Sequence, residues 1–125
     1  MVDYYTKAVT NFLLGNQCPH LRGYDFLKQA LVLALEDERK MESLGKCLYY
    51  EVAEKFMTDT INVEKCIRDV VRSWFNLNKI GGLFDEKPTN KDCITRILDN
   101  IKVRDFEPYV PLEDIPMSVY HTLFN

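Results

Sequence analysis

The segment from Val63 to Phe75 carries the clearest periodic pattern in the chain, and it constrains the fold more than any other feature. Its apolar residues recur at the spacing of one face of an α-helix over three turns, and they are Val63, Ile67, Val70, Val71 and Trp74. No segment alternates apolar and polar residues, with enrichment in Val, Ile and Thr, for long enough to predict a strand. The sequence therefore predicts an all-α fold.

Other segments show the same helical spacing of apolar residues. They predict helices at about residues 5–14, 24–35 and 44–56, and a last amphipathic helix that carries Cys93, Ile94, Ile97, Leu98 and Ile101. The polar stretch 57–62 predicts a turn, with Thr60 or Asn62 as the N-cap of the helix that follows. Gly81-Gly82 is expected to break that helix.

The length and composition of the chain predict one folded domain with a short extension. A chain of 125 residues is long enough for one compact domain and too short for two ordinary ones, and 46% hydrophobic residues exclude intrinsic disorder. Residues 1–103 balance their acidic and basic side chains, whereas residues 104–125 hold four acidic residues, one basic residue and three prolines. We therefore divide the chain into a domain at 1–103 and an acidic, Pro-containing C-terminal extension at 104–125.

The residue types associated with catalysis and metal binding are not arranged for either. The four cysteines are scattered singly, so the sequence predicts buried, reduced thiols in place of a zinc site or a dithiol motif. The two histidines, His20 and His121, lie far apart, and no glycine-rich phosphate-binding motif is present. We expect no enzymatic activity, no metal and no cofactor.

The same sequence argues against a membrane protein and sets a condition on nucleic-acid binding. No apolar run approaches the roughly 20 residues needed to cross a bilayer, and the N-terminus does not resemble a signal peptide. We expect a soluble, cytoplasmic protein. Because the net charge is −3, any contact with nucleic acid must come from a local basic patch.

Such a patch is predicted on the helix that follows the 57–62 turn. The two helices around this turn are arranged like a helix-turn-helix, with the small Ala53 on the inner face of the first helix and the second helix placed to enter the major groove of DNA. The outer face of the second helix carries Lys65, Arg68 and Arg72 at i, i+3 and i+7. These positions span about 10 Å, or about three base pairs, so the spacing predicts cations in line with base edges and phosphates.

A purely structural interpretation of these charges also exists. Glu64 and Arg68 are spaced i, i+4 as an ordinary pair on a helix surface, and Asp69 makes the patch less positive. Exposed helix faces are normally charged, so the spacing alone leaves both interpretations open.

Four separated stretches between residues 8 and 103 resemble one known domain in their order and spacing. They are residues 20–31 (HLRGYDFLKQAL), 48–56 (LYYEVAEKF), 63–68 (VEKCIR) and 87–90 (KPTN). The domain that they resemble is the C-terminal effector domain of the sporulation master regulator of endospore-forming bacteria, stage zero sporulation protein A.

The resemblance implies a compact bundle of about six helices that contains a helix-turn-helix and binds short DNA boxes. Base contacts in that family come from the start of the recognition helix, and the matching positions here hold Glu64, Lys65 and Arg68. Glutamate accepts from the cytosine amino group, and lysine reaches guanine acceptors as a point charge. We expect backbone phosphates to be contacted by Arg72, Arg22, Lys28 and Lys46.

The resemblance also implies partners. These are double-stranded DNA, a second copy as a homodimer or as tandem domains on adjacent sites, and the sigma subunit of RNA polymerase. Full-length members of the family begin with a phosphorylated receiver domain, for which 125 residues leave no room, so we expect a free-standing regulator of transcription. The segment through which the family contacts sigma is shortened here to residues 81–86.

An alternative function is a protein-interaction module that keeps the fold and modulates a full-length regulator without binding DNA. The acidic balance of the chain and Asp69 favour this alternative, whereas Glu64, Lys65 and Arg68 favour DNA binding.

The extension at 104–125 is open to more than one interpretation. We expect it to pack on the bundle and cover apolar surface through Leu112, Ile115, Val119, Tyr120, Leu123 and Phe124. Alternatively, residues 115–124 form a short helix that docks on a second copy or on a partner. A further hypothesis is that Glu107, Glu113 and Asp114 lie across the basic residues of the recognition helix and compete with phosphates.

Overall fold

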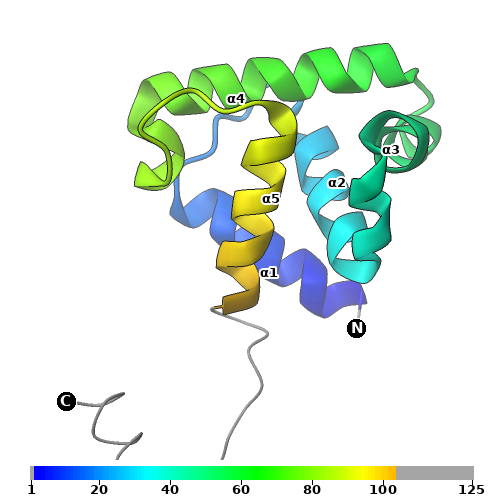
Figure 1. The fold of residues 1–125 in the computed structure, drawn as a ribbon, viewed down its shortest axis with the longest axis horizontal. Helices are drawn as coiled ribbons and strands as arrows, with labels where there is room; N and C mark the ends of the chain where they lie inside the picture. The colour runs from blue at the N-terminus through cyan, green and yellow to red at the C-terminus, as the bar shows by residue number, and fades with distance from the viewer. Residues whose placement is uncertain (1, 104–125) are drawn as a thin grey trace, which may run out of the picture.

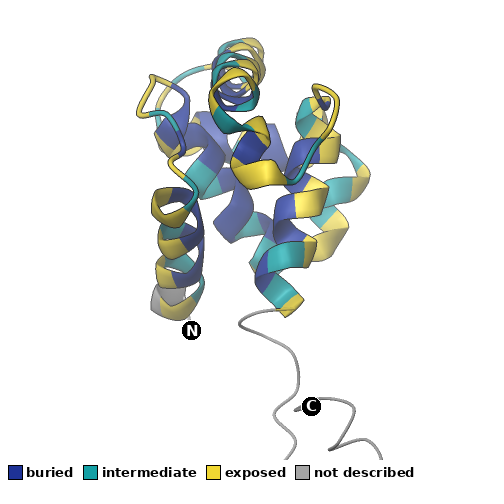
Figure 2. Cartoon of the chain, turned by 90° about the vertical axis from the view of Figure 1, so that its left-hand side faces the viewer, coloured by how far each residue is buried: buried dark blue, intermediate teal, exposed yellow. Residues whose placement is uncertain are grey.

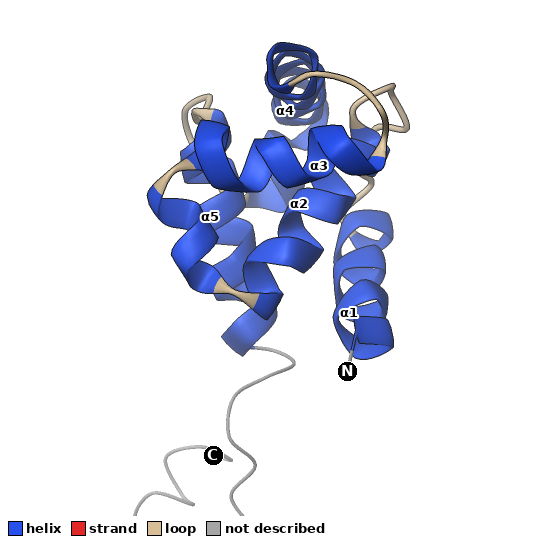
Figure 3. Cartoon of the chain, turned by 90° about the vertical axis from the view of Figure 1, so that its right-hand side faces the viewer, coloured by secondary structure: helices blue, strands red, loops and turns tan. Residues whose placement is uncertain are grey.

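The computed structural model describes residues 2–103, with side chains from Tyr4 onward, so the expectations for the extension at 104–125 lie outside the described residues. Within residues 2–103 the secondary structure is entirely helical (Figure 1, Figure 3). The five α-helices are α1 (Val2–Gly15), α2 (Tyr24–Glu36), α3 (Tyr49–Lys55), α4 (Thr60–Gly82) and α5 (Asn90–Ile101). A 3-10 helix, η1 (Glu38–Glu42), and a π-helix, η2 (Leu44–Leu48), connect α2 to α3. The all-α prediction is confirmed, with five α-helices where about six helices were expected.

Helix α2 forms the centre of the bundle. It contacts α1, α3, α4 and α5, and Leu27, Ala30, Leu31 and Ala34 on it are completely buried. Helix α4 crosses one side of the bundle, at the top of Figure 1, and α5 runs away from it toward α1. The buried surfaces of the helices face one another in one continuous core (Figure 2). One long face of α4 is therefore left on the outside of the molecule.

Helices α3 and α4 form the predicted helix-turn-helix. The two helices contact each other, and Ala53, Val63 and Ile67 are buried in the bundle. The start of α4 differs from the expectation, because Asp59 is its N-cap and its carboxylate Oδ1 accepts from the Asn62 backbone N–H at 2.7 Å. The predicted caps Thr60 and Asn62 were therefore wrong, and α4 starts three residues before Val63.

The segment expected as one helix at 44–56 consists of two pieces. The π-helix η2 covers its first turn and α3 the rest, and Met57 ends this stretch in a left-handed conformation with φ 53°. The charged stretch before it, which interrupts the apolar pattern, forms η1 with Asp37 as its N-cap. The bundle thus reaches the helix-turn-helix through two short, non-α turns that the apolar spacing did not predict.

The start of α2 lies against the backbone of α4 at Gly23. This glycine has ordinary helical angles, φ −82° and ψ 0°, so its backbone does not require glycine. A Cβ at this position would lie 2.2 Å from the carbonyl oxygen of Cys66 and 2.4 Å from its carbonyl carbon. The close contact between the two helices therefore depends on the missing side chain.

The far end of α4 is fixed to the end of α1. The backbone carbonyl of Asn16 accepts from Trp74 Nε1 at 2.8 Å and from Asn78 Nδ2 at 3.0 Å. Beyond Asn78 the chain turns with left-handed backbone angles, with φ 56° at Lys79 and 57° at the buried Ile80. The break predicted at Gly81-Gly82 thus begins at Asn78, and it sends residues 83–89 back toward the start of α4.

The cysteines differ in their exposure. Cys18, Cys66 and Cys93 are buried, as predicted, whereas Cys47 in η2 is exposed, so the prediction was wrong for Cys47. Burial raises the pKa of the Cys18 thiol to about 12 and also raises the pKa of Cys93. Both groups are therefore uncharged and shielded at neutral pH.

We expect the folded protein to show one fast-reacting thiol. At pH 8, an aromatic disulfide reagent should react rapidly with Cys47 and slowly with Cys18, Cys66 and Cys93, because the reagent must reach the sulfur and only Cys47 is exposed. All four thiols should react in urea. The check is a stopped-flow titration with Cys47→Ser as the control, which should lose the fast phase. Two or more fast thiols would contradict the buried positions.

Candidate nucleic-acid interface

Helix α4 has one buried face and one exposed face, and the exposed face carries the cations predicted from the sequence. Lys65, Arg68 and Arg72 all lie exposed to solvent, and we call these three residues the cationic row. The residues on the buried face are Val63, Ile67, Val70, Val71 and Trp74. DNA contact requires that Lys65 and Arg68 are accessible. In the described part of the chain both side chains are exposed, so this requirement is met.

Two members of the cationic row form ion pairs within α4. Arg68 Nη1 lies 3.4 Å from Glu64 Oε1, and Arg72 Nη2 lies 2.8 Å from Asp69 Oδ1. Lys65 makes no ion pair with any described residue. The row is therefore partly neutralised by acids on its own helix, as expected from Glu64 and Asp69.

These pairs are easily exchanged for a stronger anion. The side chains of Arg68 and Glu64 are each about half exposed, and exposed pairs of this kind contribute only about 0.2–1 kcal/mol. A phosphate offers an arginine two parallel hydrogen bonds and a larger negative charge. Arg68 and Arg72 can therefore move from their carboxylates to a DNA backbone or base at small cost.

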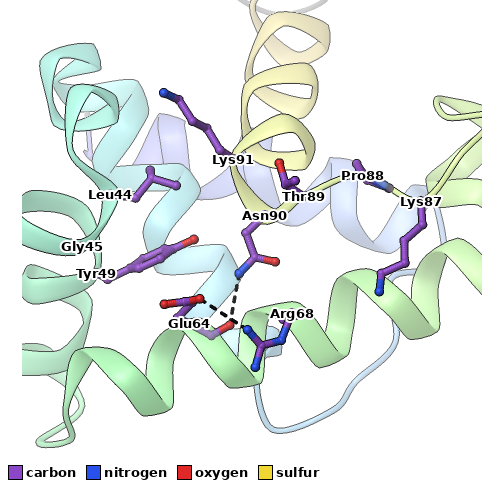
Figure 4. A pocket seen from close by; sticks show the side chains of 10 residues that line it. All are labelled: Leu44, Gly45, Tyr49, Glu64, Arg68, Lys87, Pro88, Thr89, Asn90 and Lys91. Carbon is purple, nitrogen blue, oxygen red and sulfur yellow. Dashed lines mark hydrogen bonds and ion pairs between the residues drawn. The ribbon is translucent and has the colours of Figure 1, made fainter.

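A groove of about 590 Å³ lies between α4 and the start of α5 (Figure 4). Arg68 and Glu64 line it from α4, and Lys87, Asn90 and Lys91 line it from the other side. Asn90 Nδ2 donates to the backbone carbonyl of Glu64 at 3.1 Å, which fixes the start of α5 on α4. In Figure 4 Lys87 extends toward α4, whereas Lys91 points away from it.

The inner wall of this groove is apolar. It includes Leu44 and the buried side chains of Tyr49 and Pro88. Burial raises the pKa of the Tyr49 hydroxyl, so this group stays neutral at physiological pH. The charge of the groove therefore comes from the cations Arg68, Lys87 and Lys91 against the single carboxylate of Glu64.

Lys87 was not among the residues predicted for the interface. It belongs to the stretch 87–90, which carries part of the family resemblance but was given no role in DNA contact. Its position beside Arg68 follows from the left-handed turn at the end of α4, because that turn reverses the chain. The local spacing of residues does not predict a position that depends on a reversal of the chain.

The remaining predicted phosphate contacts lie in different places. Arg22 is exposed and shares a hollow of about 310 Å³ with Lys65 and Asp69, so it adjoins the cationic row. Lys28 is half-buried on α2. Lys46 is exposed in η2, in a hollow lined by η1, η2 and α3 and by no residue of α4. The geometry thus groups Arg22 with the row and separates Lys46 from it.

The described residues contain no metal-binding group of side chains. No cluster of three or more His, Cys, Asp or Glu residues between positions 2 and 103 is arranged to hold an ion. His20 stacks on the ring of Tyr24 at 4.2 Å between centroids, which is a packing role. In the same range, no helix is both long and apolar enough to span a bilayer.

A known protein family matches most of the described part of the chain. The family model described as sporulation initiation factor Spo0A, C terminal, matches residues 9–101. The matched range includes α3, α4 and α5 completely, and with them the cationic row and the groove beside it.

Proposed function

This chain belongs to the Spo0A C-terminal family of DNA-binding sporulation effector domains, and from that premise we propose that it is a sequence-specific, DNA-binding regulator of transcription. The family is a regulatory domain and not an enzyme. The observation that carries the proposal is the cationic row, which lies exposed on the second helix of a helix-turn-helix whose other face is buried.

In this proposal each residue near the row has a role set by its chemistry. Glu64, Lys65 and Arg68 contact base edges, because they lie in the first three turns of α4, the part of a recognition helix that reaches furthest into the groove. Arg72 and Arg22 contact backbone phosphates beside them. Lys87 contacts a phosphate from the wall of the groove opposite Arg68. Lys28 and Lys46, which lie further from the row, contact more distant phosphates.

The proposal extends to the organisation of the protein. Residues 1–103 form the effector domain and residues 104–125 form an acidic extension, and the protein acts in the cytoplasm. It binds double-stranded DNA as a homodimer or as tandem copies, and contacts the sigma subunit of RNA polymerase. The family match and the charge balance of the sequence support these assignments.

One observation favours a second candidate, a protein-interaction module that modulates a full-length regulator. Glu64 and Asp69 pair with Arg68 and Arg72 and so lower the positive charge of the row. In that case the exposed face of α4 would contact the full-length regulator, and the protein would not bind DNA.

A binding selection from random short duplexes, followed by salt titration, separates the two candidates. We expect the protein to enrich a preferred duplex, and we expect its affinity to fall steeply with salt because phosphates release counterions. Arg68→Ala should lower affinity for that duplex about tenfold or more and relax the preference at one position. Lys87→Ala should weaken all duplexes alike and reduce the salt slope by about one.

Arg39→Ala is the matched control for this experiment. Arg39 is an exposed arginine paired with Asp37 in η1, and it lies in the same hollow as Lys46, away from α4. Its replacement removes the same charge and should leave DNA affinity unchanged. If the selected pool binds no better than the starting library at low salt, the DNA proposal is wrong and the interaction module remains.

A further inference from the structure

A large apolar side chain lies exposed in the first turn of α4. Ile61 is the second residue of the helix, and 78% of its surface is accessible to solvent. It precedes Lys65 by four residues, Arg68 by seven and Arg72 by eleven, which is the spacing of one helix face. Ile61 is therefore the first residue of the cationic row's own face.

Burial in the bundle does not account for Ile61. Single exposed apolar residues are common on protein surfaces, and Leu77 near the other end of α4 is one example. Ile61 differs from Leu77 by its place in line with three cations, at the end of a recognition helix that projects furthest into a groove. An isoleucine in that place has neither a hydrogen bond nor a charge to offer DNA.

The major groove presents one apolar group, the C5-methyl of thymine. The N-cap residue of α4 also affects which part of DNA the start of the helix can contact. Asp59 places a carboxylate there and occupies the Asn62 N–H at 2.7 Å, and this charge repels phosphates. The start of α4 is thus better suited to base edges than to the DNA backbone.

We propose that Ile61 is a specificity residue that packs against a thymine methyl group in the major groove. This inference rests on the proposed DNA-binding function, and it adds a thymine to the bases that the protein recognises. Four residues of helix cover about 6 Å, and base pairs are about 3.4 Å apart. The thymine therefore lies about two base pairs from the base that Lys65 contacts.

The test uses deoxyuridine, which differs from thymidine only by the absence of this methyl group. Each thymine of the selected duplex is replaced in turn, and affinities are measured for the full chain and for Ile61→Ala. One replacement should weaken binding of the unaltered protein about fourfold, the effect of removing one buried methyl-sized group. Ile61→Ala should bind the thymine and deoxyuridine duplexes equally.

Leu77→Ala is the control, because it shortens an exposed apolar side chain of the same helix outside the first turns. It should keep the full sensitivity to deoxyuridine. The inference is overturned if every replacement is tolerated, if Ile61→Ala keeps the same sensitivity, or if the selected duplex has no thymine within reach of α4. If no duplex is selected at all, the proposed function itself fails, which is a different result from a selected duplex without methyl dependence.

Discussion

Trp74→Ala is expected to destabilise the domain by about 3–5 kcal/mol, the usual cost of removing a large aromatic side chain from a core. Trp74 is completely buried, its ring lies edge-on to Phe12 at 6.4 Å between centroids, and its Nε1 donates to the Asn16 carbonyl at 2.8 Å. Domains of this size have total stabilities of about 5–15 kcal/mol, so a substantial unfolded fraction should result. Urea unfolding measures the change. It is followed by circular dichroism, because the variant lacks the only tryptophan and so has no tryptophan fluorescence to report unfolding.

Trp74→Phe separates the contribution of the ring from that of the hydrogen bond. It keeps most of the apolar volume and leaves the Asn16 carbonyl with its second donor, Asn78 Nδ2 at 3.0 Å. The loss of stability should therefore be much smaller than for Trp74→Ala. Equal losses for the two variants would show that the cavity left by the ring is not the main cause of the destabilisation.

Gly23→Ala should destabilise the fold by about 3 kcal/mol, although alanine is normally the better residue at helical angles. The added Cβ would lie 2.2 Å from the Cys66 carbonyl oxygen, and neither atom can rotate away, because the backbone of residue 23 fixes the Cβ and the oxygen belongs to the backbone of α4. Either α2 or α4 must move outward, and Lys65, the neighbour of Cys66, moves with α4. Urea unfolding measures the loss, and DNA titration should show weaker binding at temperatures where the variant is folded.

Gly15→Ala is the matched control for this substitution. Gly15 is the last residue of α1, and nothing lies within 4 Å of the position of its Cβ. Its replacement should be neutral or slightly stabilising, because it reduces the conformational freedom of the unfolded chain. A stable Gly23→Ala variant with unchanged DNA affinity would show that the helices separate without cost.

Helical periodicity was sufficient to predict which face of α4 is buried. A long amphipathic helix has only one apolar face, so Val63, Ile67 and Trp74 had to point into the bundle and Lys65 and Arg68 away from it. The pairing of Glu64 with Arg68 follows from the same geometry, because residues four apart are neighbours on a helix surface.

The contacts that spacing did not predict involve segments distant in sequence or unusual helical turns. Lys87 lines the same groove as Arg68 only because the chain reverses after Asn78. Gly23 appears in the sequence as a residue before a helix, and nothing local indicates its contact with Cys66. The burial expected for Cys47 rested on its residue type, and the π-helical turn in which it lies exposed was not predicted.

The hydrogen bonds that hold α4 in place leave its exposed side chains unused. Near its start the bond from Asn90 is accepted by a backbone carbonyl, and near its end Trp74 and Asn78 donate to the Asn16 carbonyl. Under the proposed function, folding and target choice are therefore encoded in separate residues of one helix. Under the same proposal, paralogues with new operator preferences would need only a few surface substitutions at Ile61 and along the cationic row, without compensating changes in the core.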